Sequence, residues 1–329
     1  MKTCSLLALF IFSGFAARAQ QASVPDLDRI RLAEAFRVAD AVQDRVWPGW
    51  SAAPFAVLLV TEEREFLIRH LRPSDDFAPA GYDSLLQSDV YMRPRQFATN
   101  LLATFPAVGG VSTVVIGRAE NTGRSSVAWV LTILHEHFHQ FQTAQPDYYD
   151  AVAALELSGG DETGMWMLDY PFPYDSSAVI ERFSAYSDAL QAGLESLGSE
   201  MQDEAFQRYV TAHSRLRDEL SDQDYRYLSF QLWQEGVARY IEYRVAETAV
   251  SHHSPLPAFE ALPDFMSYGA AADSIRASLI DELESLDLAA AKRLAFYPTG
   301  AAEALLLDAL KPNWKSRYFR DKFQIENLY

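Results

Sequence analysis

Residues 131–142, LTILHEHFHQFQ, place three of the chain's seven histidines and a glutamate within five consecutive positions of an apolar run. The spacing of the apolar residues predicts an α-helix. Residues four apart on a helix share a face, so the side chains of His135 and His139 can point at one metal ion. Glu136 is rotated by about 100° from His135, where it can take a proton from water without coordinating the ion. His137 lies about 200° from His135, and we expect it to be a packing or surface residue.

Two histidines are too few for a catalytic zinc site, which takes three protein ligands. We favour Glu235, in the helical stretch 230–247 (FQLWQEGVARYIEYRVAE), as the third ligand. Gly236 and Ala238 are small residues that would let this face of the helix approach the histidine helix closely across a metal. Glu242, two turns further on the same face, is a lesser candidate for the ligand or an acid that supports one.

Two other acids compete with Glu235 for the third position. Glu156 and Glu162 follow His139 closely, as the third ligand does in metallopeptidases with a short spacing between the histidine and the glutamate. Their segment, ALELSGGDETG, is interrupted by two glycines and does not resemble a continuous helix. Arg239, one turn after Glu235, is expected to orient that carboxylate.

The order of the predicted elements indicates the fold class. Strands are expected at 55–60, 64–70, 90–98 and 111–117, a loop at 72–84, and helices at 24–47, 125–142, 178–250 (with breaks near 198 and 221), 272–293 and 299–310. Strands that come before helices favour an α+β fold, with a small β-containing N-terminal lobe and a predominantly helical C-terminal lobe. We expect one domain, 20–329, in which the N-terminal α/β lobe is 20–142 and the helical lobe is 143–329. The histidine helix then lies at the junction of the two lobes.

Residues 1–19, MKTCSLLALFIFSGFAARA, have the pattern of a secretory signal peptide. Lys2 gives the positive start, an apolar core follows at 6–15, and the small residues around Arg18 form a cleavage site. The apolar core is too short to span a bilayer, so we expect no stable membrane insertion after cleavage. The predicted location is therefore periplasmic or extracellular. The chain's single cysteine, Cys4, lies in this segment, so no disulfide is expected in the mature protein.

The acidic composition disfavours two classes of partner. A formal net charge of −17 repels the phosphates of nucleic acids and of anionic lipids. The sequence also contains no glycine-rich phosphate loop and no Gly-x-Ser-x-Gly turn. We therefore expect neither a nucleic-acid partner nor a serine hydrolase of that type. The sequence carries no signal for an oligomeric state.

The stretches ILHEHFHQFQ and WQEGVARYIE together resemble the gluzincin-type zinc metallopeptidases, in which a later helix adds a glutamate to a His-Glu-x-x-His helix. The resemblance covers about twenty residues in two blocks, and His139 and Glu235 are further apart than in the best-known members. It implies a zincin-like fold, one Zn²⁺ ion on His135, His139 and Glu235, and Glu136 as general base. It also implies that an edge strand beside the histidine helix pairs with the extended substrate. Residues 111–117 (VSTVVIG) are the candidate, and an interior strand is the alternative for this segment.

The motif and the resemblance lead us to expect a secreted zinc-dependent peptidase that acts on a peptide or protein substrate. The alternatives are a zinc hydrolase of another substrate and a non-catalytic binding protein of the same fold. A donor for the developing oxyanion is also needed, and Tyr174, His213, Tyr240 and Tyr297 are the candidates. The aromatic segment 165–175 either lines a substrate pocket or caps a domain edge.

Overall fold

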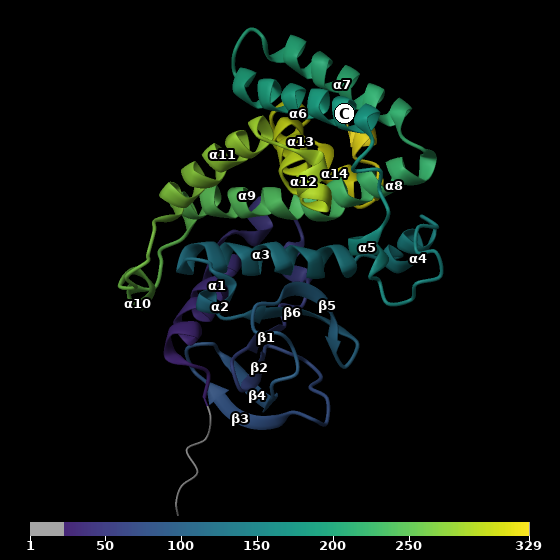
Figure 1. Cartoon of the computed structure of the whole chain (residues 1–329). Helices are drawn as coiled ribbons and strands as arrows, with labels where there is room; N and C mark the ends of the chain where they lie inside the picture. The colour runs from purple at the N-terminus through teal and green to yellow at the C-terminus, as the bar shows by residue number, and fades with distance from the viewer. Residues whose placement is uncertain (1–22, 329) are drawn as a thin grey trace, which may run out of the picture.

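The computed structural model describes residues 23–328 (Figure 1). The predicted signal peptide lies outside these residues. The helices are α1 (Asp26–Val46), α2 (Ala119–Thr122), α3 (Ser126–Thr143), α4 (Tyr148–Ala153), α5 (Trp166–Asp169), α6 (Ser177–Ser196), α7 (Gln202–Glu219), α8 (Asp222–Gln231), α9 (Val237–His252), α10 (Pro257–Glu260), α11 (Tyr268–Glu284), α12 (Leu288–Ala291), α13 (Phe296–Leu310) and α14 (Trp314–Tyr318). The single turns are η1 (Trp50–Ala52), η2 (Leu232–Gly236), η3 (Lys292–Ala295) and η4 (Ile325–Leu328), of which η2 is a π-helix and the others are 3₁₀-helices. The strands are β1 (Val57–Val60), β2 (Arg64–Ile68), β3 (Ala78–Asp83), β4 (Ser88–Pro94), β5 (Leu102–Val108) and β6 (Val111–Gly117).

The predicted α+β class is confirmed, with the sheet in the N-terminal part and a mainly helical C-terminal region. The strand order is β3-β4-β2-β1-β6-β5, in which β1 and β6 run parallel and the other neighbouring strands antiparallel. Strand β6 therefore lies inside the sheet, so of the two alternatives left open for 111–117 the structure has the interior strand and not the edge strand. The edges are β3 and β5.

Neither edge strand was predicted from the sequence, and the physical reason is the same for both. The segment 72–84 was expected to be a loop but contains β3, and β5 was not predicted at all. Each carries a proline, Pro79 or Pro106, and each shows a register shift where it pairs with its neighbour. Proline cannot donate to the hydrogen-bond ladder and is confined to edges and bulges, so it weakens the sequence pattern of a strand.

Helix α3 lies between the sheet and the helical region (Figure 1). It packs on β5 and β6 below and on α9 above, and α1 contacts both α3 and α9. Helix α13 packs on α9 and η2, and α6 and α7 pack further out. All but two of the eighteen residues of α3 are buried, as its apolar composition predicts. None of the helices in residues 23–328 combines the length and apolar character needed to span a bilayer.

The π-helical turn η2 joins α8 to α9, and α13 crosses it at a pair of glycines. A Cβ atom placed on Gly236 would lie 2.4 Å from the Cα of Gly300, so the two backbones touch. The small residue after Glu235 therefore permits close approach of α13. This corrects the prediction that Gly236 faces the histidine helix.

Candidate metal centre

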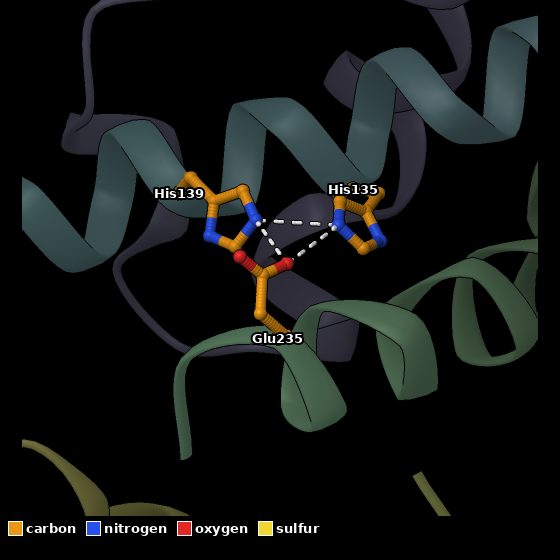
Figure 2. Close-up of side chains that lie close together, drawn as sticks. All are labelled: His135, His139 and Glu235. Atoms are coloured by element: carbon orange, nitrogen blue, oxygen red, sulfur yellow. Dashed lines mark hydrogen bonds and ion pairs between the residues drawn. The ribbon is translucent and has the colours of Figure 1, made fainter. Parts of the chain in front are cut away.

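Two neighbouring elements bring three possible metal ligands together. His135 and His139 extend from α3 towards Glu235, which extends from η2 (Figure 2). The Nε2 atoms of the two histidines are 3.2 Å apart. Glu235 Oε2 lies 3.7 Å from His135 Nε2 and 3.4 Å from His139 Nε2. This is the set of three residues that the sequence favoured.

The size of this triangle fits a single ion. In a tetrahedral zinc site, nitrogen and oxygen ligands at about 2.0–2.2 Å from the metal lie about 3.3–3.6 Å from one another. The three observed separations, from 3.2 to 3.7 Å, fall around this range. Two imidazoles and a carboxylate are also ligands that zinc prefers. The group could therefore bind a divalent metal ion.

The hydrogen bonds of the two imidazoles leave their Nε2 atoms free for a metal. His135 Nδ1 lies 2.9 Å from Glu242 Oε1, and a carboxylate can only accept, so Nδ1 carries the proton. His139 Nδ1 lies 2.6 Å from Gln142 Oε1, to which it can donate in the same way. Metal-binding histidines commonly donate their other N–H to a carboxylate or carbonyl oxygen. Glu242 thus hydrogen-bonds to one of the possible ligands and does not belong to the three-residue group itself.

The charges at the site favour a cation at its centre. Burial alone would lower the pKa of His135, but hydrogen bonds to Glu235 and Glu242, together with the charges of Glu242 and Glu136, raise it to about 10. Burial would raise the pKa of Glu235, yet the two neighbouring histidines hold it well below its usual range. The side chains of the three residues are only 7%, 8% and 18% exposed, so solvent screens them weakly. Both shifts mean that the surroundings stabilise positive charge where the three side chains meet.

Arg239 supports Glu242 instead of Glu235. Its Nη1 donates to Glu242 Oε2 at 2.7 Å, and its Nη2 lies 3.3 Å from Glu282 Oε1. The prediction that Arg239 orients Glu235 is therefore wrong. Burial would raise the pKa of Glu242, but the Arg239 charge and the hydrogen bond from His135 lower it to about 2. The carboxylate on His135 is thus held in its charged form.

Glu136 is directed towards the edge of the sheet. Thr104 of β5 lies with its hydroxyl 2.8 Å from Glu136 Oε2 and 2.9 Å from the backbone oxygen of the same residue. Glu136 is buried but does not belong to the three-residue group. Thr104 was not among the predicted site residues, because strand β5 was not predicted.

Tyr297 is the candidate oxyanion donor that lies at the site. Its ring is parallel to that of His135, with centroids 6.2 Å apart. Arg293 Nη1 donates to the Tyr297 hydroxyl at 2.9 Å and lies 3.6 Å from Glu235 Oε1. Burial and the charge of Glu235 raise the pKa of Tyr297, so its hydroxyl keeps its proton. Arg293 was not foreseen from the sequence.

The other three candidate donors differ in how far they lie from the site. Tyr240 donates to Asp308. His213 lies among tyrosine rings of the helical region, and Tyr174 packs near Phe296. Phe296 directly precedes Tyr297, and the charge of Arg293 reaches Tyr174, so the structure separates only Tyr240 and His213 from Tyr297.

The remaining sequence candidates lie away from the metal group. His137 stacks on Phe55 with centroids 3.8 Å apart, and burial lowers its pKa to about 3. Its predicted packing role is confirmed. Glu156 and Glu162 are exposed in the segment after α4, and neither belongs to a metal-binding group found in residues 23–328.

The chain matches no known protein family, and comparisons with curated proteins and with solved structures gave no significant match either. The function is therefore inferred from the residues of the site and their geometry.

Proposed function

We propose that the protein is an exported zinc-dependent metallopeptidase, with one Zn²⁺ ion held by His135, His139 and Glu235. The observation that carries the proposal is the triangle formed by these residues, together with the glutamate of the His-Glu-x-x-His motif beside it. A zinc ion on three protein ligands leaves a position for water or substrate, polarises a carbonyl oxygen and lowers the pKa of water. The resemblance of the two sequence blocks to the gluzincin-type peptidases supports peptides as the substrate class.

Glu136 acts as the general base in this proposal. Thr104 hydrogen-bonds to Oε2 of the carboxylate and fixes its orientation. The carboxylate accepts a proton from the attacking water while the water oxygen bonds to the scissile carbonyl carbon. Glu136 then returns this proton to the departing nitrogen as the carbon–nitrogen bond breaks.

Tyr297 donates a hydrogen bond to the oxygen that becomes negative when the carbonyl is attacked. The hydroxyl oxygen already accepts a hydrogen bond from Arg293. A donor bound to that oxygen polarises the O–H bond of Tyr297 and strengthens its donation. Arg293 thereby orients Tyr297 and makes it a better donor.

Strand β5 takes the substrate-binding role that was predicted for β6. It is the edge strand on the side of the sheet where β6 and β5 meet α3, and its Thr104 contacts the general base. An extended peptide that adds to this edge forms backbone hydrogen bonds with β5. Its scissile carbonyl is then delivered beside Glu136.

Replacement of Glu136 by Gln tests the proposal, because it removes the base and keeps all three metal ligands. We expect the variant to retain its zinc, measured by elemental analysis, and to lose at least about 100-fold in kcat on a cleaved peptide found by library screening. Asp150→Asn, an isosteric change outside the site, serves as a control that keeps full activity. Wild-type activity in Glu136→Gln would contradict the general-base role. Zinc binding by the wild type without cleavage of any peptide would instead favour a zinc hydrolase of another substrate or a non-catalytic binding protein.

A further inference from the structure

We propose that Tyr318, in the C-terminal helix α14, is a positioning residue for the metal centre. Its hydroxyl connects η2, which carries Glu235, to Gln142, which orients His139. The inference rests on the metal centre of the proposed function. It assigns a role to a residue that lies far from the ligands in the sequence and belongs to no recognised motif.

The direction of the hydrogen bonds around Tyr318 follows from the partners. The backbone oxygen of Trp233 can only accept, so the Tyr318 hydroxyl donates to it, at 2.6 Å. The hydroxyl oxygen then accepts from Gln142 Nε2, at 2.7 Å. Two further carbonyls, those of Trp233 and Gln234, lie 3.3 and 3.1 Å from the same nitrogen. Tyr318 therefore makes the shortest of the three contacts to the Gln142 amide nitrogen.

This arrangement determines which nitrogen of His139 faces the metal site. With its NH₂ group directed at three acceptors, Gln142 must present Oε1 to His139 Nδ1, 2.6 Å away. His139 Nδ1 also lies 3.1 Å from Gln234 Nε2, but the contact to Gln142 Oε1 is shorter. His139 Nδ1 then carries the proton, and the lone pair of Nε2 is directed at Glu235 and His135. A hydrogen-bond chain of two links thus runs from Tyr318 to a metal ligand.

The same tyrosine holds the other ligand-bearing element. The Trp233 indole N–H donates to the Tyr318 backbone oxygen at 3.1 Å, and the two rings stack with centroids 4.4 Å apart. Trp233 lies within the π-helical turn, two residues before Glu235. Such turns are rare and interrupt the regular helical ladder, so outside contacts are needed to fix their carbonyls. Tyr318 provides one of these contacts and is itself fully buried.

Packing alone does not explain the hydroxyl of Tyr318. The ring fills space against Trp47, Trp233 and Phe319, which a phenylalanine would also do. The hydroxyl, in contrast, contacts the residue that orients His139 and the backbone beside Glu235. Its removal should therefore alter the metal site and leave the packing in place.

The test is the metal affinity of Tyr318→Phe, measured by competition between the protein and a chelator for Zn²⁺. Partners of metal ligands typically contribute 10- to 100-fold to affinity, and for this more distant group we expect a loss of about tenfold. The visible spectrum of the Co²⁺ form should change, because the geometry around His139 relaxes. Tyr268→Phe is the matched control, since it removes a buried hydroxyl that donates to Glu34 at 3.0 Å, in a part of the fold without metal ligands. It should lose stability and keep wild-type affinity.

A double-mutant cycle with Gln142→Met shows whether Tyr318 acts through Gln142. If it does, Tyr318→Phe weakens Zn²⁺ binding in the wild type and has little further effect in Gln142→Met. Unchanged affinity and an unchanged Co²⁺ spectrum in a folded Tyr318→Phe would overturn the inference. If that variant does not fold, unchanged affinity in Gln142→Met would overturn it. A wild-type protein that binds no divalent metal would instead overturn the proposed function.

Discussion

At the scale of single residues, the candidate metal centre depends on residues that hydrogen-bond to the three possible ligands. Glu242 accepts from His135 and is held in turn by Arg239, which also contacts Glu282. This chain fixes the orientation of the imidazole and increases its basicity. The sequence placed Glu242 on the right helical face, but it could not show which ring nitrogen the carboxylate meets.

Glu242→Gln should weaken zinc binding by about 10- to 100-fold, because a neutral amide is a poorer acceptor for His135 Nδ1–H. Chelator competition measures the change. Glu282→Gln is the matched control, because it alters the second carboxylate that Arg239 contacts. The side chain of Glu282 is more exposed than that of Glu242, so the substitution should change the zinc affinity by less than about threefold. Equal affinities in Glu242→Gln and the wild type would contradict the role of Glu242.

Glu303 gives a residue-scale prediction for pH. Its carboxyl group is fully buried in α13 and lies 2.6 Å from the Tyr209 hydroxyl. Burial raises its pKa to about 8. The folded state therefore keeps a proton that the unfolded chain releases above about pH 4.5, so stability falls as the pH rises from about 4.5 to 8.

The slope from this single group approaches about 1.4 kcal/mol per pH unit in that window. Glu303→Gln removes the titration and keeps the shape of the side chain. Urea unfolding at pH 5 and pH 8 should show a smaller loss of stability in the variant than in the wild type. Identical pH profiles would contradict the raised pKa.

At the scale of elements, the contact between η2 and α13 positions Glu235. The backbones of Gly236 and Gly300 touch there, and Tyr297 reaches the site from the start of α13. A π-helical turn commonly marks a functional site, since it changes the direction of the side chains it carries. The crossing therefore relates the position of the proposed metal ligand Glu235 to that of the proposed oxyanion donor.

Gly236→Ala should destabilise the fold by more than about 3 kcal/mol, because its Cβ would overlap backbone atoms of Gly300 that cannot rotate away. Gly269→Ala in α11 is the control, for which we expect no loss of stability. Its added Cβ meets only Val250, at 3.7 Å, and the change should be neutral or stabilise by up to about 1 kcal/mol. Denaturant unfolding compares the two, and a stable Gly236→Ala protein would contradict the close crossing.

The long helices of the site were predictable from the sequence, and the contacts between them were only partly so. Helix α3 has an apolar run and a capping serine, Ser125, and both signals are local. The Gly109–Gly110 pair just before β6 is a hairpin signal that would have revealed β5 and hence Thr104. The π-helical turn has no such signature. The contact of Gln142 with Tyr318 joins residues 176 positions apart, and no local pattern reports it.

At the scale of the whole molecule, the site lies between two layers that are far apart in the sequence. Helix α3 packs on the sheet, and η2 and α9 belong to the helical region above it (Figure 1). A bound ion would thus crosslink the two layers, and its binding free energy would add to the stability of the folded chain. The N-terminal part supplies the proposed base and substrate edge, while the C-terminal part supplies the third ligand and Tyr297.

The zinc content of the purified protein tests the central claim most directly. After equilibration with Zn²⁺ and gel filtration, elemental analysis of the wild type, His139→Ala and Glu235→Ala should give one ion per wild-type chain and little in either variant. Circular dichroism confirms that the variants are folded. Retention of zinc by Glu235→Ala, or a wild-type protein without zinc, would contradict the proposed centre.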